Sequence, residues 1–220
     1  MDGYSLVAFF QKGGMFMYPI LFVFLTGMAI ALERWFQLGR IRSVNRKMWN
    51  VLYPLLAKGD LDKVREIVGK DKSTISQMLG MGLERHGVVR RREDIEIAME
   101  ESMMEIIPRL EKRTPYVALL SNIATLLGLL GTIMGLIEAF TAVANANPSE
   151  KADLLSASIS VAMNTTAFGL MSAIPLLLLH AKLMSTTGQV VDSLEMASVK
   201  ALNSISNSSR QKLEDTQSIK

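Results

Sequence analysis

Residues 114–137, TPYVALLSNIATLLGLLGTIMGLI, form a run of twenty-four uncharged residues between Arg113 and Glu138. A bilayer's hydrocarbon core of about 30 Å needs ~20 helical residues, so the run predicts a membrane-spanning helix. Lipid gives helices no hydrophobic reason to associate, so small residues at helical spacing mark where backbones approach each other. This run carries such a stripe: Gly128, Gly131, Thr132, Gly135 and, just beyond it, Ala139.

Two further uncharged runs flank this one. Residues 13–32 give twenty uncharged positions and residues 154–181 give twenty-eight, each long enough to cross a bilayer. The last run carries a second stripe of small residues: Ser158, Ala162, Thr166, Gly169 and Ala173. Hydrophobic residues make up 49% of the chain and charged residues 20%, so apolar spans must alternate with parts in water. The sequence predicts an all-α membrane protein whose three transmembrane helices extend into cytoplasmic helices.

The orientation follows from where the basic residues gather. They crowd the chain just after the first run and just before the second, whereas residues 145–153 contain only Lys151. Basic residues mark cytoplasmic segments, so the middle of the chain is expected inside. The first run is expected to remain as a helix, because it lacks the basic leader and cleavage site of a signal peptide. The expected organisation is an extracytoplasmic N-terminus (1–12), helix 1 (13–38), a cytoplasmic helical segment (39–115), helix 2 (116–144), a periplasmic loop (145–153), helix 3 (154–181), and a cytoplasmic C-terminal helix and tail (182–220).

The cytoplasmic segment has a helical pattern. Asp60 is placed to cap a short helix that runs through Val64 and Val68. A second helix is expected from Glu93, with its apolar positions at Ile97, Met103, Met104 and Ile107. About seventy-five residues make a small independent core, so the segment is expected to pack on extensions of the spans or on neighbouring subunits.

The borders of this segment also have signals. Pro108 and Pro115 predict a bend where the cytoplasmic helix meets the second span. After the third span, one helix face continues, and beyond Ser206 the polar sequence is expected to fray. That face consists of Leu183, Val190, Leu194, Ala197, Ala201 and Ile205.

Catalytic and metal-binding patterns are lacking. The chain has no cysteine and two histidines, and it has no nucleophile elbow or phosphate-binding loop, so neither an enzyme nor a cofactor is expected. Gly131 and Gly135 have the spacing of a nucleotide loop, but inside an apolar span that spacing indicates helix packing. Gly169 and Ala173 are assigned the same packing role on the third span. Since one three-helix subunit offers little to bury both stripes, they are expected to build a ring-shaped homo-oligomer.

Thr132 and Thr166 each lie in the middle of a small-residue stripe. A membrane threonine often bonds only the carbonyl one turn before it. Two such threonines on successive spans favour a polar seam that faces a functional group. Glu138 is the one carboxylate near membrane depth, and two interpretations stay open: a role in ion entry or a partner contact, and a solvated helix end.

At these residues the chain resembles the ExbB/TolQ/MotA family of ion-driven motor subunits. The resemblance is carried by LLGLLGT (126–132) with Gly135, and by TTAFGL (165–170) with AIP (173–175). The two blocks stand in the family's order, and the three-span layout is closer to the ExbB and TolQ branch than to flagellar stators.

The resemblance implies a pentamer around a pore. The pore would hold an ExbD- or TolR-like single-span partner dimer whose membrane aspartate carries the proton, with a TonB-like or TolA-like protein beyond it. Thr132 and Thr166 match the family's pore threonines, and the implied ion path also takes in Thr165, Asn164, Ala162 and Gly128. Val161 stands where relatives near ExbB often have a glutamate.

The family therefore implies a motor subunit of the bacterial inner membrane, with its N-terminus periplasmic and its C-terminus cytoplasmic. Together with its partner it would form a proton channel that converts ion-motive force into mechanical work on the envelope. A passive membrane scaffold or a subunit of a small transporter is the alternative. A transporter that works alone would show broken helices or inverted repeats, and the chain has no detectable repeat.

Overall fold

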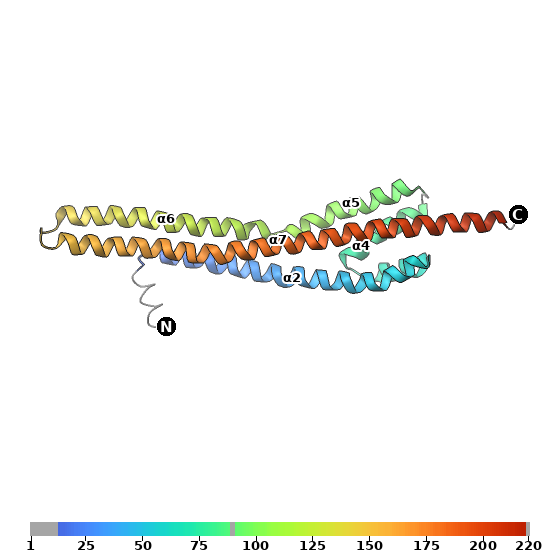
Figure 1. Ribbon diagram of the computed structural model, residues 1–220, viewed down its shortest axis with the longest axis horizontal. Helices are drawn as coiled ribbons and strands as arrows, with labels where there is room; N and C mark the ends of the chain where they lie inside the picture. Colours follow the sequence, from blue (N-terminus) through green and yellow to red (C-terminus); the bar gives the residue numbers. More distant parts are fainter. Residues whose placement is uncertain (1–12, 89–90, 219–220) are drawn as a thin grey trace. The chain divides into compact units, whose positions relative to one another are not determined.

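The computed structural model describes residues 13–88 and 91–218, so the expected N-terminal segment 1–12 lies outside the described residues. Throughout these ranges the secondary structure is helical, with no strand (Figure 1). The helices are α2 (Met17–Ala57), α3 (Leu61–Lys70), α4 (Thr74–Val88), α5 (Arg92–Glu111), α6 (Thr114–Asn145) and α7 (Lys151–Ser218).

Three helical stretches are long and apolar enough to cross a membrane. They are Met17–Ala57, Arg92–Asn145 and Lys151–Asn207, whose most apolar windows have mean hydropathies of 1.5, 1.9 and 1.6. Only 22% to 28% of each window is buried inside the subunit. Helices with such apolar exteriors need lipid or other protein around them.

The helix ends differ in two places from the expected boundaries. The break between α6 and α7 covers residues 146–150, and α7 starts at Lys151, inside the expected loop 145–153. Asp153 lies in the first turn of α7, where a negative charge interacts favourably with the helix dipole and stabilises the helix. At the other end the helix continues to Ser218, so the expectation of fraying beyond Ser206 was wrong for the backbone.

The chain folds into two units that interleave along the sequence. Unit 1 is Met1–Arg34 with Arg113–Leu183, and unit 2 is Trp35–Lys112 with Met184–Lys220. Unit 1 contains the three uncharged runs, and unit 2 contains most of the charged residues. Each unit is described separately below.

Unit 1 has a small apolar core and a charged border. The core is formed by Ile20, Ala124 and Ala173. At the border the Arg113 guanidinium contacts both carboxylate oxygens of Glu33, at 2.7 and 2.9 Å. Arg113 has a left-handed φ of 67°, and it lies between the end of α5 and the start of α6.

Unit 2 is packed around α7. The predicted apolar face of this helix is confirmed, because all six of its residues are at most 2% exposed. Its contacts include a hydrogen bond from the Ser198 hydroxyl to the Met99 sulfur of α5, at 3.7 Å, and a cation–π contact of Lys200 with Tyr53 of α2. The segment that was expected to be cytoplasmic therefore packs on extensions of the spanning helices, which was one of the two expected arrangements.

The N-terminus of α3 is capped as predicted. Gly59 takes the left-handed φ of 71° in the turn after α2, and Asp60 then accepts a hydrogen bond from the Lys63 backbone N–H at 3.4 Å. The Lys63 ammonium reaches the same carboxylate at 2.5 Å. This side-chain hydrogen bond holds the pKa of Asp60 below its ordinary value.

The predicted apolar face of α5 was wrong. Ile97 and Met104 are 51% and 71% exposed, and the buried side of the helix is instead formed by Ile95, Ala98, Met99, Ser102, Ile106 and Leu110. Because α5 carries apolar residues on two sides, the spacing of these residues alone does not identify which side is buried. The helix breaks between the two prolines, as expected: Pro108 lies in the last turn of α5, which ends at Glu111, and Pro115 lies in the first turn of α6.

A buried amide joins α2 to α4. Asn45 is 4% exposed, and its side chain both donates to and accepts from the Thr74 hydroxyl, at 2.7 and 3.0 Å. Its oxygen also accepts from the Ile75 backbone N–H at 3.4 Å. Asn45 therefore caps the first turn of α4 from a helix 29 residues earlier in the sequence.

Candidate functional site

The two small-residue stripes face each other in unit 1. A Cβ atom built on Gly169 would lie 2.8 Å from the Ala124 carbonyl oxygen and 2.9 Å from the Gly128 Cα atom. Real side chains do not approach backbone so closely, so only glycine fits where α6 and α7 meet. Further along the contact, a Cβ on Gly135 would lie 2.9 Å from the Ala162 Cβ. The expectation that one subunit could not bury both stripes was wrong, because the stripes cover each other.

The hydroxyls of Thr132 and Thr166 meet at this contact. They hydrogen-bond to each other, and both reach the carbonyl oxygen of Gly128. The distance is 3.2 Å from Thr132, one turn later on the same helix, and 2.9 Å from Thr166 on α7. Both threonines are half-buried. The two hydroxyls are called the threonine pair below, and with the Gly128 carbonyl they form one polar cluster.

Thr165 points elsewhere. It is 2% exposed, and its hydroxyl donates to the Gly13 carbonyl at 2.6 Å or to the Val161 carbonyl at 3.0 Å. Its methyl group is the closest neighbour of Gly131, where any Cβ would collide with it. Successive residues on a helix point about 100° apart, which separates Thr165 from Thr166. Thr165 thus connects α7 to the chain just before α2.

The remaining sequence-predicted residues have different surroundings. Ala162 and Gly128 are buried in the α6–α7 contact, as are Gly131, Gly169 and Ala173. Asn164 is half-buried, two residues before Thr166 on α7. Glu138 is exposed and forms no ion pair with any residue in the described ranges.

One residue of the contact was missed by the sequence reasoning. Ser121 is fully buried and donates to the Ala173 carbonyl at 2.8 Å. The signal was present, because Ser121 lies seven residues before Gly128 and so extends the first stripe by two turns. Its bond crosses from α6 to α7, as the bond from Thr166 does in the opposite direction.

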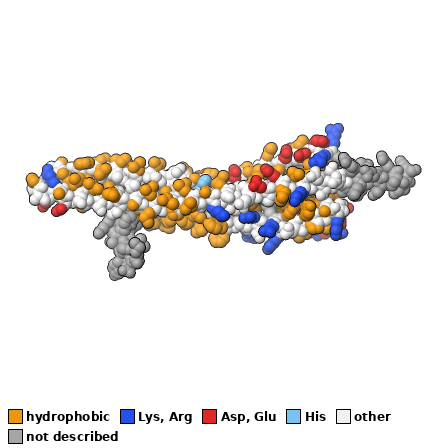
Figure 2. All heavy atoms as spheres, viewed as in Figure 1, with side chains coloured by type: hydrophobic (Ala, Val, Ile, Leu, Met, Phe, Trp, Pro, Cys, Tyr) orange, Lys and Arg blue, Asp and Glu red, His pale blue; other side chains and the backbone are white. Residues whose placement is uncertain are grey.

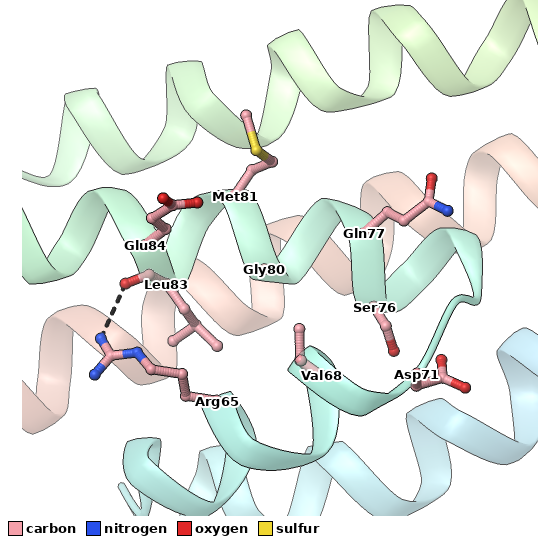
Figure 3. Close-up of a pocket in the computed structure, with 10 residues that line it drawn as sticks. Arg65, Val68, Asp71, Ser76, Gln77, Gly80, Met81, Leu83 and Glu84 are labelled. Atoms are coloured by element: carbon pink, nitrogen blue, oxygen red, sulfur yellow. Dashed lines mark hydrogen bonds between the residues drawn. The ribbon is translucent and has the colours of Figure 1, made fainter.

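Unit 2 has clefts between its helices. One, of about 450 Å³, lies between α3 and α4, where Arg65 donates to the Leu83 carbonyl at 3.1 Å (Figure 3). A Cβ on Gly80 would lie 3.2 Å from a Val68 methyl group, so the helices approach closely here. Across the described parts of the chain, no three His, Asp or Glu side chains cluster to hold a metal ion.

Comparisons with known proteins point to one family. The MotA/TolQ/ExbB proton channel family matches over residues 70–196. The chain is 32% identical to the ExbB-like 1 biopolymer transport protein of Synechocystis sp., over 83% of this chain and 72% of that protein. It is 27% identical to an ExbB homologue of Methanothermobacter thermautotrophicus, over 87% and 67% respectively. It is also similar to the Tol-Pal system protein TolQ of Haemophilus influenzae, 33% identical over 39% of this chain and 37% of that protein.

Proposed function

The chain belongs to the MotA/TolQ/ExbB proton channel family, and from this premise we propose that it is the ring-forming subunit of an ion-driven motor in the bacterial inner membrane. The threonine pair carries the proposal, because it places two hydroxyls at the contact of the two spans that hold the family's motif blocks. The proposed complex is a pentamer around an ExbD- or TolR-like dimer. In it the protein would turn proton flow into mechanical work on the envelope, where a TonB-like or TolA-like protein would receive it.

The number of hydroxyl protons in the threonine pair supports a role in ion transfer. Thr132 and Thr166 have one hydroxyl proton each, and a hydroxyl both donates and accepts. When Thr132 donates to Thr166, Thr166 can donate to the Gly128 carbonyl, and the Thr132 oxygen keeps free lone pairs. When the direction reverses, Thr132 donates to Gly128 and the Thr166 oxygen is the free acceptor. The pair can therefore accept from a protonated carboxyl, and a hydroxyl that leaves Gly128 can donate to a carboxylate.

A membrane carboxyl that alternates between these forms fits the proposed partner. The chain has no acidic residue between Asp153 and Lys182 or between Arg113 and Glu138, so the proton carrier is proposed to come from the partner. Each proton that crosses the membrane makes available ~2.3 kcal/mol per 100 mV. The orientation proposed from the basic flanks places residues 39–115 and 182–220 in the cytoplasm.

The internal bonds of the threonine pair also favour a second candidate, a passive scaffold. Hydroxyls that bond only Gly128 and each other would hold α6 to α7 and do nothing more. Replacing Thr166 by Val distinguishes the two functions, because Val keeps the shape and removes the hydroxyl.

The test measures proton flux and energised output in cells with the native partner, together with the amount of assembled complex. We expect Thr166→Val and Thr132→Val to abolish flux while the complex persists, and Thr166→Ser to retain more flux than Val. The matched control is Thr125→Val, because Thr125 bonds the carbonyl one turn back at 3.2 Å, as Thr132 does. Wild-type flux in both Val variants, with the complex intact, would favour the scaffold.

A further inference from the structure

Opposite charges lie on opposite sides of unit 2. Helix α5 has seven acidic residues and two arginines, whereas α2 from Trp35 to Ala57 has four basic residues and no acid. The two helices lie on either side of α7 (Figure 1), and Figure 2 shows acidic side chains along the edge formed by α5 and basic side chains along the opposite edge.

Each of these helices exposes apolar residues among its charges. The basic stripe of α2 is Arg40, Val44, Lys47 and Val51, and the acidic stripe of α5 is Ile97, Glu100, Glu101 and Met104. All eight residues are exposed. The apolar ones are large side chains, with Val51 and Ile97 each 51% exposed and Met104 71%. Apolar side chains set among charges are typical of a surface that another protein covers.

The charges of both stripes lack partners in the subunit. Arg40, Lys47, Glu100 and Glu101 form no ion pair with any residue in the ranges 13–88 and 91–218. The two stripes do not meet within one copy, because the acidic stripe lies on the side of α5 opposite its buried residues. A second copy of the chain, however, would present an acidic stripe to the basic stripe of the first.

The two stripes lie at the same level of unit 2. Arg40 and Arg109 line one cleft of about 450 Å³, which sets a common level for α2 and α5. From this level α2 and α5 run along unit 2 in opposite chain directions (Figure 1). Lys47 lies seven residues after Arg40 and Glu101 lies eight residues before Arg109, so at 1.5 Å per residue both are about 10–12 Å away from the cleft in the same direction. Rotation about an axis parallel to the helices keeps every residue at its level.

The spacing of the stripes also matches. In α2 the steps from Val44 to Lys47 and on to Val51 are three and four residues. In α5, read in the reverse direction, the steps from Met104 to Glu101 and on to Ile97 are the same. A neighbour placed by rotation would therefore set Val44 opposite Met104, Lys47 opposite Glu101 and Val51 opposite Ile97.

We infer that the acidic stripe of α5 docks on the basic stripe of α2 of the next copy, and that this head-to-tail contact sets the order of subunits around the ring. A contact between two different surfaces continues from copy to copy until it closes. The charge pairs select the partner and the level, and the apolar residues supply buried area. This inference rests on the proposed function in one respect, the ring of subunits, and it depends on neither the threonine pair nor ion flow.

Cysteine crosslinking tests the contact, because the chain has no cysteine of its own. Membranes containing the chain with both Val51→Cys and Ile97→Cys are treated with a short bismaleimide. We expect a ladder of covalent oligomers that ends at the ring size. Chains with either change alone should stay monomeric, and a mixture of the two single variants should stop at dimers. The control pairs Val51→Cys with Met81→Cys, an exposed position on α4 outside both stripes, and should give no ladder.

Charge exchange tests the pairing. Lys47→Glu alone and Glu101→Lys alone should each lower the crosslinking yield several-fold, and the two together should restore it. Glu84→Lys, an exposed change on α4, is the matched control and should leave the yield unchanged. Efficient crosslinking of either single-cysteine chain would overturn the inference, and so would the absence of a ladder from the double variant. If Thr166→Val is added to the double-cysteine chain and gives a full ladder but no flux, the subunit contact and the ion path are independent. If the double-cysteine chain gives normal flux but no ladder, the contact is refuted and the proposed function is not.

Discussion

The hydroxyl of Thr166 on α7 lies 2.9 Å from the carbonyl oxygen of Gly128 on α6, and Thr132 shares the same acceptor from its own helix. A side chain can reach the backbone of a neighbouring span only where the two helices are very close. Gly128 and Gly169 provide that closeness, since neither has a side chain to separate the backbones. The polar cluster therefore depends on the glycine contact beside it.

Replacing Gly169 by Ala should loosen α6 from α7. The new Cβ would lie 2.8 and 2.9 Å from backbone atoms that cannot move aside, and such overpacking costs about 1–3 kcal/mol. The thermal unfolding temperature of the detergent-purified protein should fall. Gly188→Ala is the control on the same helix, because nothing lies within 4 Å of its Cβ. This control should be neutral or stabilise by up to ~1 kcal/mol through helix propensity, and equal melting of both variants would contradict the close contact.

Replacing Asn45 by Ala should release the first turn of α4. The change removes the partner of the Thr74 hydroxyl and of the Ile75 N–H in a buried place, at a cost of about 1–3 kcal/mol. Hydrogen exchange of the amides of residues 74–76 should become faster, while that of α3 should stay unchanged. Asn50→Ala, at an exposed position on the same helix, should leave both rates as they are.

Asp71 should make unit 2 sensitive to acid. Burial raises the pKa of Asp71, but hydrogen bonds from Ser73, Ser76 and backbone N–H groups outweigh it, and the net pKa is lowered. A carboxyl with a lowered folded-state pKa stabilises the fold above its unfolded pKa of about 3.9 and loses that effect as the pH falls through the folded value. Melting temperatures between pH 6 and pH 3 should therefore decline less steeply for Asp71→Asn than for the unmodified chain. Parallel curves for the two proteins would count against the hydrogen-bonded carboxylate.

The orientation can be tested by labelling single cysteines. A maleimide that does not cross the membrane should label Asn147→Cys in intact cells and should not label Glu84→Cys, because the basic flanks predict that α4 lies in the cytoplasm. Both positions are exposed, so both should react once the cells are permeabilised. The opposite labelling pattern would reverse the proposed topology.

The sequence correctly predicted the buried face of a helix where the apolar residues recur along a single face. The buried face of α7 beyond Leu183 was predicted because its apolar residues recur at helical spacing along one face, and the cap at Asp60 was predicted because its signal is local. For α5 the same reasoning failed, since Ile95 and Ile97 belong to opposite faces that are both apolar. A single sequence does not say which face meets its own chain and which is left for another.

At the candidate site, the sequence located the threonines but not their relations. Spacing along each helix placed Thr132 and Thr166 in small-residue stripes, whereas their shared acceptor depends on how far α6 slides along α7. That register is set by backbone contacts such as the Ser121 bond to the Ala173 carbonyl, which leave little trace in residue type. Thr165 and Thr166, adjacent in the sequence, were grouped together, and only the helix geometry assigns Thr165 to Gly13.

The interleaving of the two units has a consequence for synthesis. Residues 35–112 leave the ribosome before the second and third spans exist, yet the part of α7 that completes their core begins only at Met184. Chains generally fold from the N-terminus as they emerge, so these helices must wait with their apolar sides uncovered while two spans insert. A chain that stops shortly after Leu183 would have every membrane segment and would still be open to proteolysis in unit 2. Cellular quality control can therefore recognise an unfinished copy by this exposed surface.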